Sequence, residues 1–97
     1  MTNNRLIVLG SKRDVASFQE SNWDRRLRTR YREMLEQSKG RYASQFTTEI
    51  PPIKVLTKLS RQWPRLTFLI SYESGRTRVI GIVKAKAGEL EEYEIKY

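Results

Sequence analysis

Residues 46–73, FTTEIPPIKVLTKLSRQWPRLTFLISYE, decide the fold class, because one short stretch predicts a strand, a helix and a second strand. Pro51-Pro52 begins the helix, since proline supplies a helical φ and the first turn does not need its missing N–H. Pro64 ends the helix, because the residue before a proline is disfavoured in the helical region. The apolar run from Arg65 to Glu73 then predicts a strand. This arrangement is typical of an α+β domain.

The helix between these prolines is amphipathic. Its apolar positions, which we expect to face the core, are Ile53, Val55, Leu56, Leu59 and Trp63. The opposite face carries Lys54, Lys58 and Arg61. One side of this helix is therefore expected to pack, while the other presents positive charge.

Upstream, Arg5–Leu9 is a near-continuous apolar run that suits a strand at the centre of a sheet. After a short helical segment at Val15–Glu20, Ser21 and Asp24 form a capping-box pattern that predicts the start of a helix. Apolar residues then recur with helical spacing at Trp23, Leu27, Tyr31, Met34 and Leu35. Because Ser38-Lys39-Gly40 is typical of a helix end, we expect an amphipathic helix over residues 21–38.

The remaining segments alternate in the manner of half-buried strands. They cover residues 41–48, 77–86 and 90–97, with two-residue turns predicted at Ser74-Gly75 and Ala87-Gly88. The predicted order is β-α-β-α-β-β-β in a single domain spanning residues 1–97. We expect an α+β two-layer sandwich, with a mostly antiparallel sheet and two helices on one face.

Composition narrows the classes of partner. Lysine and arginine number 19 against 11 aspartates and glutamates, for a net charge of +8, which favours nucleic acid or an acidic protein as partner, or serves only solubility. The chain has no cysteine and no histidine, so thiolate and imidazole chemistry are excluded. Its longest apolar run, Leu6–Leu9, is far too short for a membrane span. We predict a cytoplasmic protein of a bacterial host without a small-molecule cofactor, a metal or a membrane partner.

One family resemblance rests on a set of short motifs. These are Phe46, Thr48, Pro51-Pro52, Leu59-Ser60, Trp63-Pro64, Leu66-Thr67-Phe68 and Tyr72-Glu73, with Asn22-Trp23 upstream. Together they resemble the ferredoxin-like C-terminal domain of YubB-like proteins, which are encoded largely on plasmids and phages. The chain departs from that pattern at Ile50, where the family usually has tryptophan, and at Asp24, where it usually has glycine. The resemblance implies a ferredoxin-like fold and a mobile-element origin, and it implies no catalytic residue.

Five arginines lie within eight residues of the predicted 21–38 helix: Arg25, Arg26, Arg28, Arg30 and Arg32. Arginine makes forked contacts with phosphate, so this cluster predicts a nucleic-acid or nucleoprotein partner, with the basic face of the second helix extending the surface. Alternatively, the cluster is a solvated face held by local pairs such as Arg32 with Glu36. The first interpretation predicts a non-enzymatic binding protein, for which a counter-defence inhibitor such as an anti-CRISPR is one example.

The C-terminal strands predict a second surface. If both turns have two residues, Glu73 pairs with Arg76 and Lys86 with Glu89. One sheet face then carries Leu66, Phe68, Ile70, Val79, Val83 and Leu90, and the other carries Leu69, Ile80, Ile82, Tyr93, Ile95 and Tyr97, edged by Arg78. Because two helices cover only one face, the second face is predicted to be exposed. It would serve as a homodimer interface or as a base-stacking platform.

Catalysis is the remaining alternative. A small basic protein without histidine fits the profile of RelE-type messenger-RNA-cleaving toxins, and such a site would use Tyr72, Arg76, Arg78 or Lys84. The strand expected between the two helices argues against that class. Strand alternation also separates Glu89 and Glu91 from Glu92 and Glu94, which argues against a cation site. We therefore expect no enzyme.

Overall fold

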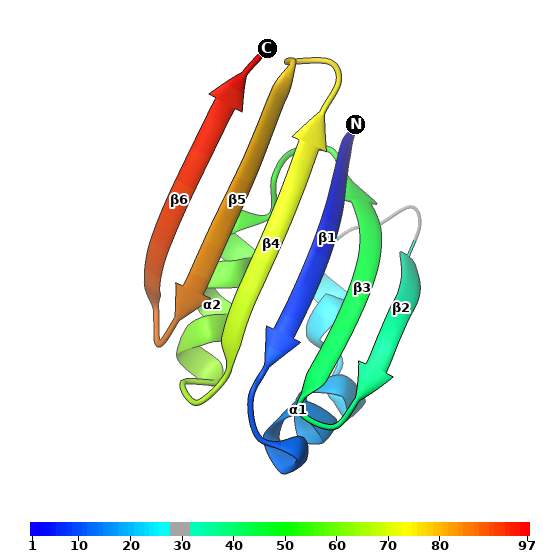
Figure 1. The fold of residues 1–97 in the computed structure, drawn as a ribbon, viewed down its shortest axis with the longest axis vertical. Helices are drawn as coiled ribbons and strands as arrows, with labels where there is room; N and C mark the ends of the chain where they lie inside the picture. The colour runs from blue at the N-terminus through cyan, green and yellow to red at the C-terminus, as the bar shows by residue number, and fades with distance from the viewer. Residues whose placement is uncertain (28–31) are drawn as a thin grey trace.

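The computed structural model describes residues 1–27 and 32–97, which form an antiparallel sheet with helices on one face (Figure 1). The elements are β1 (Thr2–Leu9), α1 (Lys12–Glu20), the 3-10 helix η1 (Trp23–Arg26), β2 (Arg32–Ser38), β3 (Arg41–Thr48), α2 (Ile53–Gln62), β4 (Thr67–Ser74), β5 (Val79–Lys86) and β6 (Glu89–Lys96). In the described part of the chain there are thus six strands and two α-helices. The predicted α+β class, antiparallel sheet and one-sided helical layer are confirmed.

The strand order is β2-β3-β1-β4-β5-β6, and each neighbouring pair is antiparallel. The chain segment that contains α1 joins β1 to β2, two strands that are separated by β3, while α2 joins β3 to β4, which are separated by β1. Both helices therefore cross the same face, and β5 and β6 extend the sheet beyond β4 as hairpins (Figure 1).

The predicted helix over residues 21–38 is wrong. Of its described residues, 23–26 form the single 3-10 turn η1 and 32–38 form edge strand β2. Strand β2 pairs with β3, with Glu33 opposite Gln45 and Ser38 opposite Arg41. Gly40, at φ +76°, lies in the hairpin turn rather than at a helix end. Glycine with positive φ suits both a helix C-terminus and a tight hairpin, so the local signal was ambiguous. The observed order accordingly has one more strand than predicted.

Phe18 of α1 is the centre of the core between the helices and the sheet. The centre of its ring is 5.3 Å from the ring centre of Phe68 in β4, 5.4 Å from that of Trp23 in η1 and 5.6 Å from that of Trp63 after α2. Such offset and edge-on aromatic pairs stabilise beyond the area they bury. The apolar stripe predicted for α2 also packs here, with Leu56 and Leu59 buried and its other members partly buried.

The two C-terminal hairpins differ from expectation in one turn only. Lys86 pairs with Glu89 as predicted, but Glu73 pairs with Ile80 rather than Arg76, because the β4–β5 turn contains residues 75–78. A shift from 76 to 80 is an even number of residues, so every side chain stays on its predicted face. Of the predicted inner face, the buried members are Leu66, Phe68, Ile70, Val79 and Val83, while Leu90 on edge strand β6 is 37% exposed.

Candidate functional site: a cationic groove beside α2

A groove of about 290 Å³ lies between η1 and α2 in the helical layer. Its lining residues are Asn22, Trp23, Arg25, Lys54, Val55, Lys58, Leu59 and Gln62. Three of these eight side chains are cations, and no carboxylate is among the described lining residues. We call this feature the cationic groove.

The wall formed by α2 follows from helical spacing. Lys54, Lys58 and Gln62 are each four residues apart, so they lie one above the other on one side of the helix. Leu59 is buried toward the core and forms part of the groove floor, whereas both lysines are exposed. The amphipathic pattern of α2 thus directs its lysines into the groove.

The opposite wall depends on one anchored tryptophan. Trp23 is 95% buried and stacks on Phe18, and its ring also lies edge-on to Tyr42 and Phe46 of β3. Arg25, two residues further along η1, is exposed beside α2. The short helix would have little stability by itself, so the packing of Trp23 positions Arg25.

The structure brings together only part of the predicted arginine and lysine set. Arg25 joins Lys54 and Lys58. Arg61 lies further along α2 and packs beside Gly88, since a Cβ added to that glycine would be 2.8 Å from Arg61 Cγ. Arg26 ends η1 and Arg32 begins β2, so the continuous arginine face predicted for a helix is wrong. Arg28 and Arg30 lie outside the described residues.

Two amide side chains of the groove, Asn22 and Gln62, were not predicted. The i, i+4, i+8 spacing of Lys54, Lys58 and Gln62 contains the signal for Gln62. Asn22 has no such signal, because its position beside α2 depends on how η1 packs. Both amides can donate hydrogen bonds to an anion.

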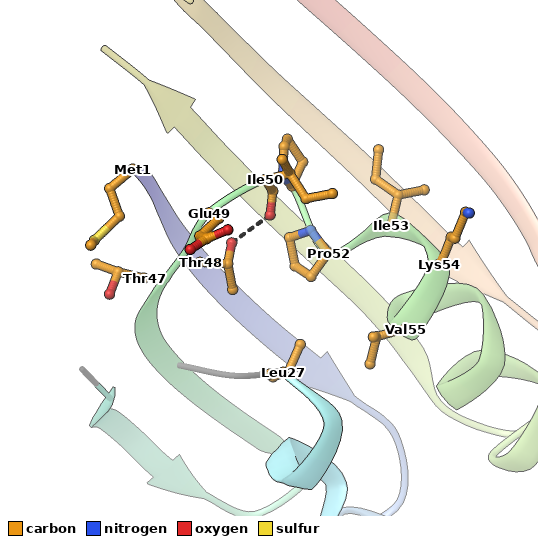
Figure 2. A pocket seen from close by; sticks show the side chains of 11 residues that line it. Met1, Leu27, Thr47, Thr48, Glu49, Ile50, Pro52, Ile53, Lys54 and Val55 are labelled. Atoms are coloured by element: carbon orange, nitrogen blue, oxygen red, sulfur yellow. Dashed lines mark hydrogen bonds between the residues drawn. The ribbon is translucent and has the colours of Figure 1, made fainter. Parts of the chain in front are cut away.

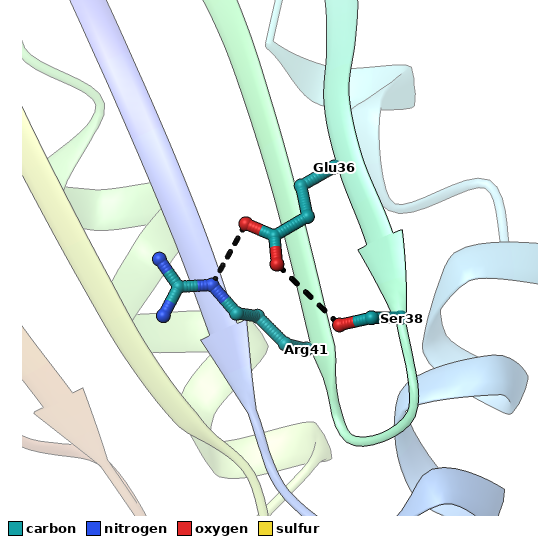
Figure 3. A network of polar contacts seen from close by, with 3 residues as sticks. All are labelled: Glu36, Ser38 and Arg41. Carbon is teal, nitrogen blue, oxygen red and sulfur yellow. Dashed lines mark hydrogen bonds and ion pairs between the residues drawn. The ribbon is translucent and has the colours of Figure 1, made fainter.

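Arg41 and Arg65 are ion-paired, whereas the three cations of the groove have no ion pair among the described residues. Arg41 Nε lies 3.0 Å from Glu36 Oε2, and Glu36 also accepts a hydrogen bond from Ser38 (Figure 3). Arg65 is paired in the same way with Asp14 at 2.8 Å. Within residues 1–27 and 32–97, no ion pair involves Arg25, Lys54 or Lys58. The groove therefore keeps its positive potential.

A larger apolar pocket of about 580 Å³ adjoins the groove, because Lys54 and Val55 line both (Figure 2). It lies where the end of β3 leads into α2. Thr48 holds this connection, since its hydroxyl accepts from buried Asn4 Nδ2 at 2.9 Å and donates to the Ile50 carbonyl at 2.6 Å. The walls are mainly aliphatic and proline side chains, including Pro52.

The predicted exposed sheet face is also present. Its exposed fractions are 45% for Ile80, 53% for Ile82, 71% for Tyr93, 68% for Ile95 and 49% for Tyr97, while Leu69 is partly buried. The Arg78 guanidinium lies 5.6 Å from the centre of the Tyr97 ring. The exposure of this surface is confirmed, and its role as an interface stays a prediction.

Of the residues considered for a toxin-like site, Tyr72 and Lys84 lie on opposite faces of the sheet. Tyr72 points to the helical side of the sheet, where its hydroxyl lies 2.9 Å from Glu94 Oε2 and 3.3 Å from Glu92 Oε1. Burial, together with these carboxylates, raises the pKa of Tyr72. Lys84 lies on the other face, opposite Leu69. Glu92 and Glu94 are likewise separated by the sheet from Glu89 and Glu91, as predicted.

No family model, curated protein or solved structure matches this chain. In residues 1–27 and 32–97, no helix has both the length and the apolar character needed to cross a membrane.

Proposed function

We propose that this protein binds nucleic acid, without catalysing a reaction on it, through the cationic groove. The supporting observation is that three cations from two separate elements, Arg25, Lys54 and Lys58, line one groove without a described carboxylate partner. Lysine and arginine that displace counterions from phosphates supply most of the affinity of such binding. A purely solubilising surface would instead mix both signs of charge.

The neighbouring apolar pocket favours a single strand. A groove of about 290 Å³ is too small to admit a duplex, but backbone phosphates can bind along it. At Lys54 and Val55 it adjoins the apolar pocket, which offers space for an unstacked base. Single strands expose their bases, whereas a duplex keeps them stacked. We therefore expect single-stranded oligonucleotides to bind more tightly than duplexes of the same length.

We further infer that β1, α1, β2, β3, α2 and β4 form a ferredoxin-like unit. The support is their order in the sheet, β2-β3-β1-β4, with each helix joining strands that have another strand between them. Strands β5 and β6 are then an extension of that unit. The relationship to YubB-like proteins, a mobile-element origin and a counter-defence role stay predictions.

The test compares two triple variants of equal charge. Arg25→Glu, Lys54→Glu and Lys58→Glu remove the groove cations, while Lys12→Glu, Arg13→Glu and Lys39→Glu change exposed residues elsewhere. Each set lowers the net charge by three times two, from +8 to +2. Fluorescence anisotropy with a labelled single strand is measured over a series of salt concentrations.

We expect the groove variant to bind at least ~10-fold more weakly than the control variant, and the magnitude of its logarithmic salt slope to fall by roughly 2, since each single-strand phosphate contact contributes about 0.7. Circular dichroism establishes that both variants are folded. Equal weakening in both variants would mean that overall charge alone causes binding, and the groove proposal would then be wrong.

A further inference from the structure

The exposed faces of β5 and β6 carry a regular pattern. Cross-strand neighbours on this face are Lys86 with Glu89, Lys84 with Glu91, Ile82 with Tyr93 and Ile80 with Ile95. One half of the two-stranded surface is therefore apolar and the other half is charged. All the cations lie on β5 and all the anions on β6, and no ion pair among the described residues joins them. We call these eight side chains the β5–β6 patch.

The apolar half of this patch has no cover within the described chain. Both α-helices lie on the other side of the sheet (Figure 1). Tyr93 and Ile95 are each about 70% exposed on β6, where all eight residues of the strand are exposed. Contiguous apolar side chains exposed in this way are typical of surfaces that bind a partner.

We propose that a second copy of this chain packs on the β5–β6 patch around a two-fold axis parallel to the strands and lying between β5 and β6. Such an axis places β5 of one copy above β6 of its partner at the same height, about 10 Å away. Because the register puts Lys84 level with Glu91, Lys84 then faces the partner's Glu91. Lys86 faces the partner's Glu89 in the same way, and Ile82 faces the partner's Tyr93.

Other arrangements of two copies are disfavoured by the same charges. A two-fold axis across the strands, through the centre of the patch, would reverse the strand direction and place the lysines and glutamates of one copy above the apolar half of its partner, where the charges have no opposite partner. Edge-to-edge antiparallel pairing of two β6 strands about Tyr93 would place Glu92 opposite the partner's Glu94. Charged edge strands are a common protection against such pairing.

A nucleic acid is a poorer fit to this patch than a second copy. Its two lysines are matched by two glutamates at the same heights, so the patch has no excess positive charge to attract phosphates. The face-to-face arrangement covers only two strands of each copy. This places the dimer at the small end of protein interfaces, and we expect it to depend on concentration in the micromolar range.

The test exchanges the charges without losing the cross-strand pairs within one chain. In the variant Lys84→Glu, Lys86→Glu, Glu89→Lys, Glu91→Lys, every lysine–glutamate pair is kept with reversed polarity. This variant should form a homodimer as the wild type does. Mixed with the wild type, it should form few heterodimers, because β5 of each copy would then face β6 of like charge. Native mass spectrometry of the mixture measures the three species.

Two further variants complete the test. Lys84→Glu with Lys86→Glu alone makes both strands acidic, so the dimer dissociation constant measured by sedimentation equilibrium should rise at least ~10-fold. The control Lys12→Glu with Arg13→Glu, on α1, should leave that constant unchanged. Ile82→Asp should also give a monomer that keeps its circular dichroism. A wild type that stays monomeric at several hundred micromolar would overturn the proposal. So would statistical or preferred mixing of the exchanged variant with the wild type, or a dimer that resists all these changes.

Discussion

On β5, Val79 and Val83 point toward the helices and are at most 8% exposed. Their neighbours Ile80 and Ile82 point to the opposite face and are about half exposed. The four side chains are all β-branched and aliphatic, so their chemistry does not explain this difference. Helices α1 and α2 cover only the first face, where aromatic rings interlock around Phe18. Coverage by a second layer, rather than hydrophobicity, separates a core from an exposed surface in this molecule.

The largest expected difference between the faces is in core packing. Phe18→Ala should lower the free energy of unfolding by about 3–5 kcal/mol, because it leaves a cavity among packed rings. Tyr93→Ala, on the exposed sheet face, should change the stability of the monomer by no more than about 0.5 kcal/mol. Urea unfolding at concentrations where the protein is monomeric measures both. Similar losses from the two variants would contradict the contrast between the faces.

A smaller effect is expected from two glycines. A Cβ added at Gly81 would overlap the Tyr72 ring on the helical side of the sheet, whereas one at Gly75 would meet no atom within 4 Å. Gly81→Ala should therefore destabilise the fold by about 1–3 kcal/mol, since overpacking forces side chains to shift. Gly75→Ala is the matched control, with a change below about 0.5 kcal/mol. Thermal unfolding of both variants decides the point.

The hydroxyl of Tyr72 should contribute a pH-dependent stability. Its loss in Tyr72→Phe should cost about 0.5–1.5 kcal/mol at pH 7. Because the pKa of Tyr72 is raised in the folded state, the phenol binds its proton more tightly there than in the unfolded chain. The protonated phenol therefore stabilises the folded state fully below about pH 10, the ordinary tyrosine pKa, and this stabilisation is lost as the pH rises further.

Urea unfolding between pH 8 and 11 should therefore show a steeper alkaline decline for the wild type than for Tyr72→Phe. Exposed Tyr97, whose pKa is also raised, through its hydrogen bond to Glu73, is the comparison on the open side. Tyr97→Phe should keep most of the wild-type decline. If Tyr72→Phe has the wild-type pH profile, burial and the β6 carboxylates do not raise the pKa of Tyr72 in the folded state.

The smallest effect is expected at the ion pair on the β2–β3 edge. Glu36→Gln removes the partner of Arg41, but both side chains are about 40% exposed. Exposed pairs contribute roughly 0.2–1 kcal/mol, and salt screens them. Chemical denaturation with and without added salt measures the loss, which should shrink at high salt. A loss well above this range would contradict the expectation that an exposed ion pair contributes little to stability.

Several elements could be predicted because their signals are local. The ends of α2 are set by the prolines that flank it, and its buried side by its own apolar spacing. Strands β3 and β4 follow from the alternation of residues within each strand. Strand parity also explains why the exposed face of Ile82 and Tyr93 was correctly predicted although the β4–β5 turn was not. A shift of four residues changes the partner and keeps the face.

The site was less predictable, and β2 shows the reason. Residues 32–38 fit a helical pattern, but pairing with β3 outweighs that local preference. As a result Met34 and Leu35 are exposed rather than buried, and Arg32 lies on a strand instead of the predicted helix. The cationic groove arises because Trp23 packs on Phe18 beside α2, a contact between separate elements.

By itself, the sequence determined the α+β class, the ends of α2, its basic face and the two faces of the C-terminal strands, because each follows from spacing within a short segment. Only the tertiary structure decided that residues 32–38 form a strand and that Arg25 joins Lys54 and Lys58. It also decided which sheet face the helices cover. These outcomes depend on the free energy of contacts between distant segments, which no local pattern contains.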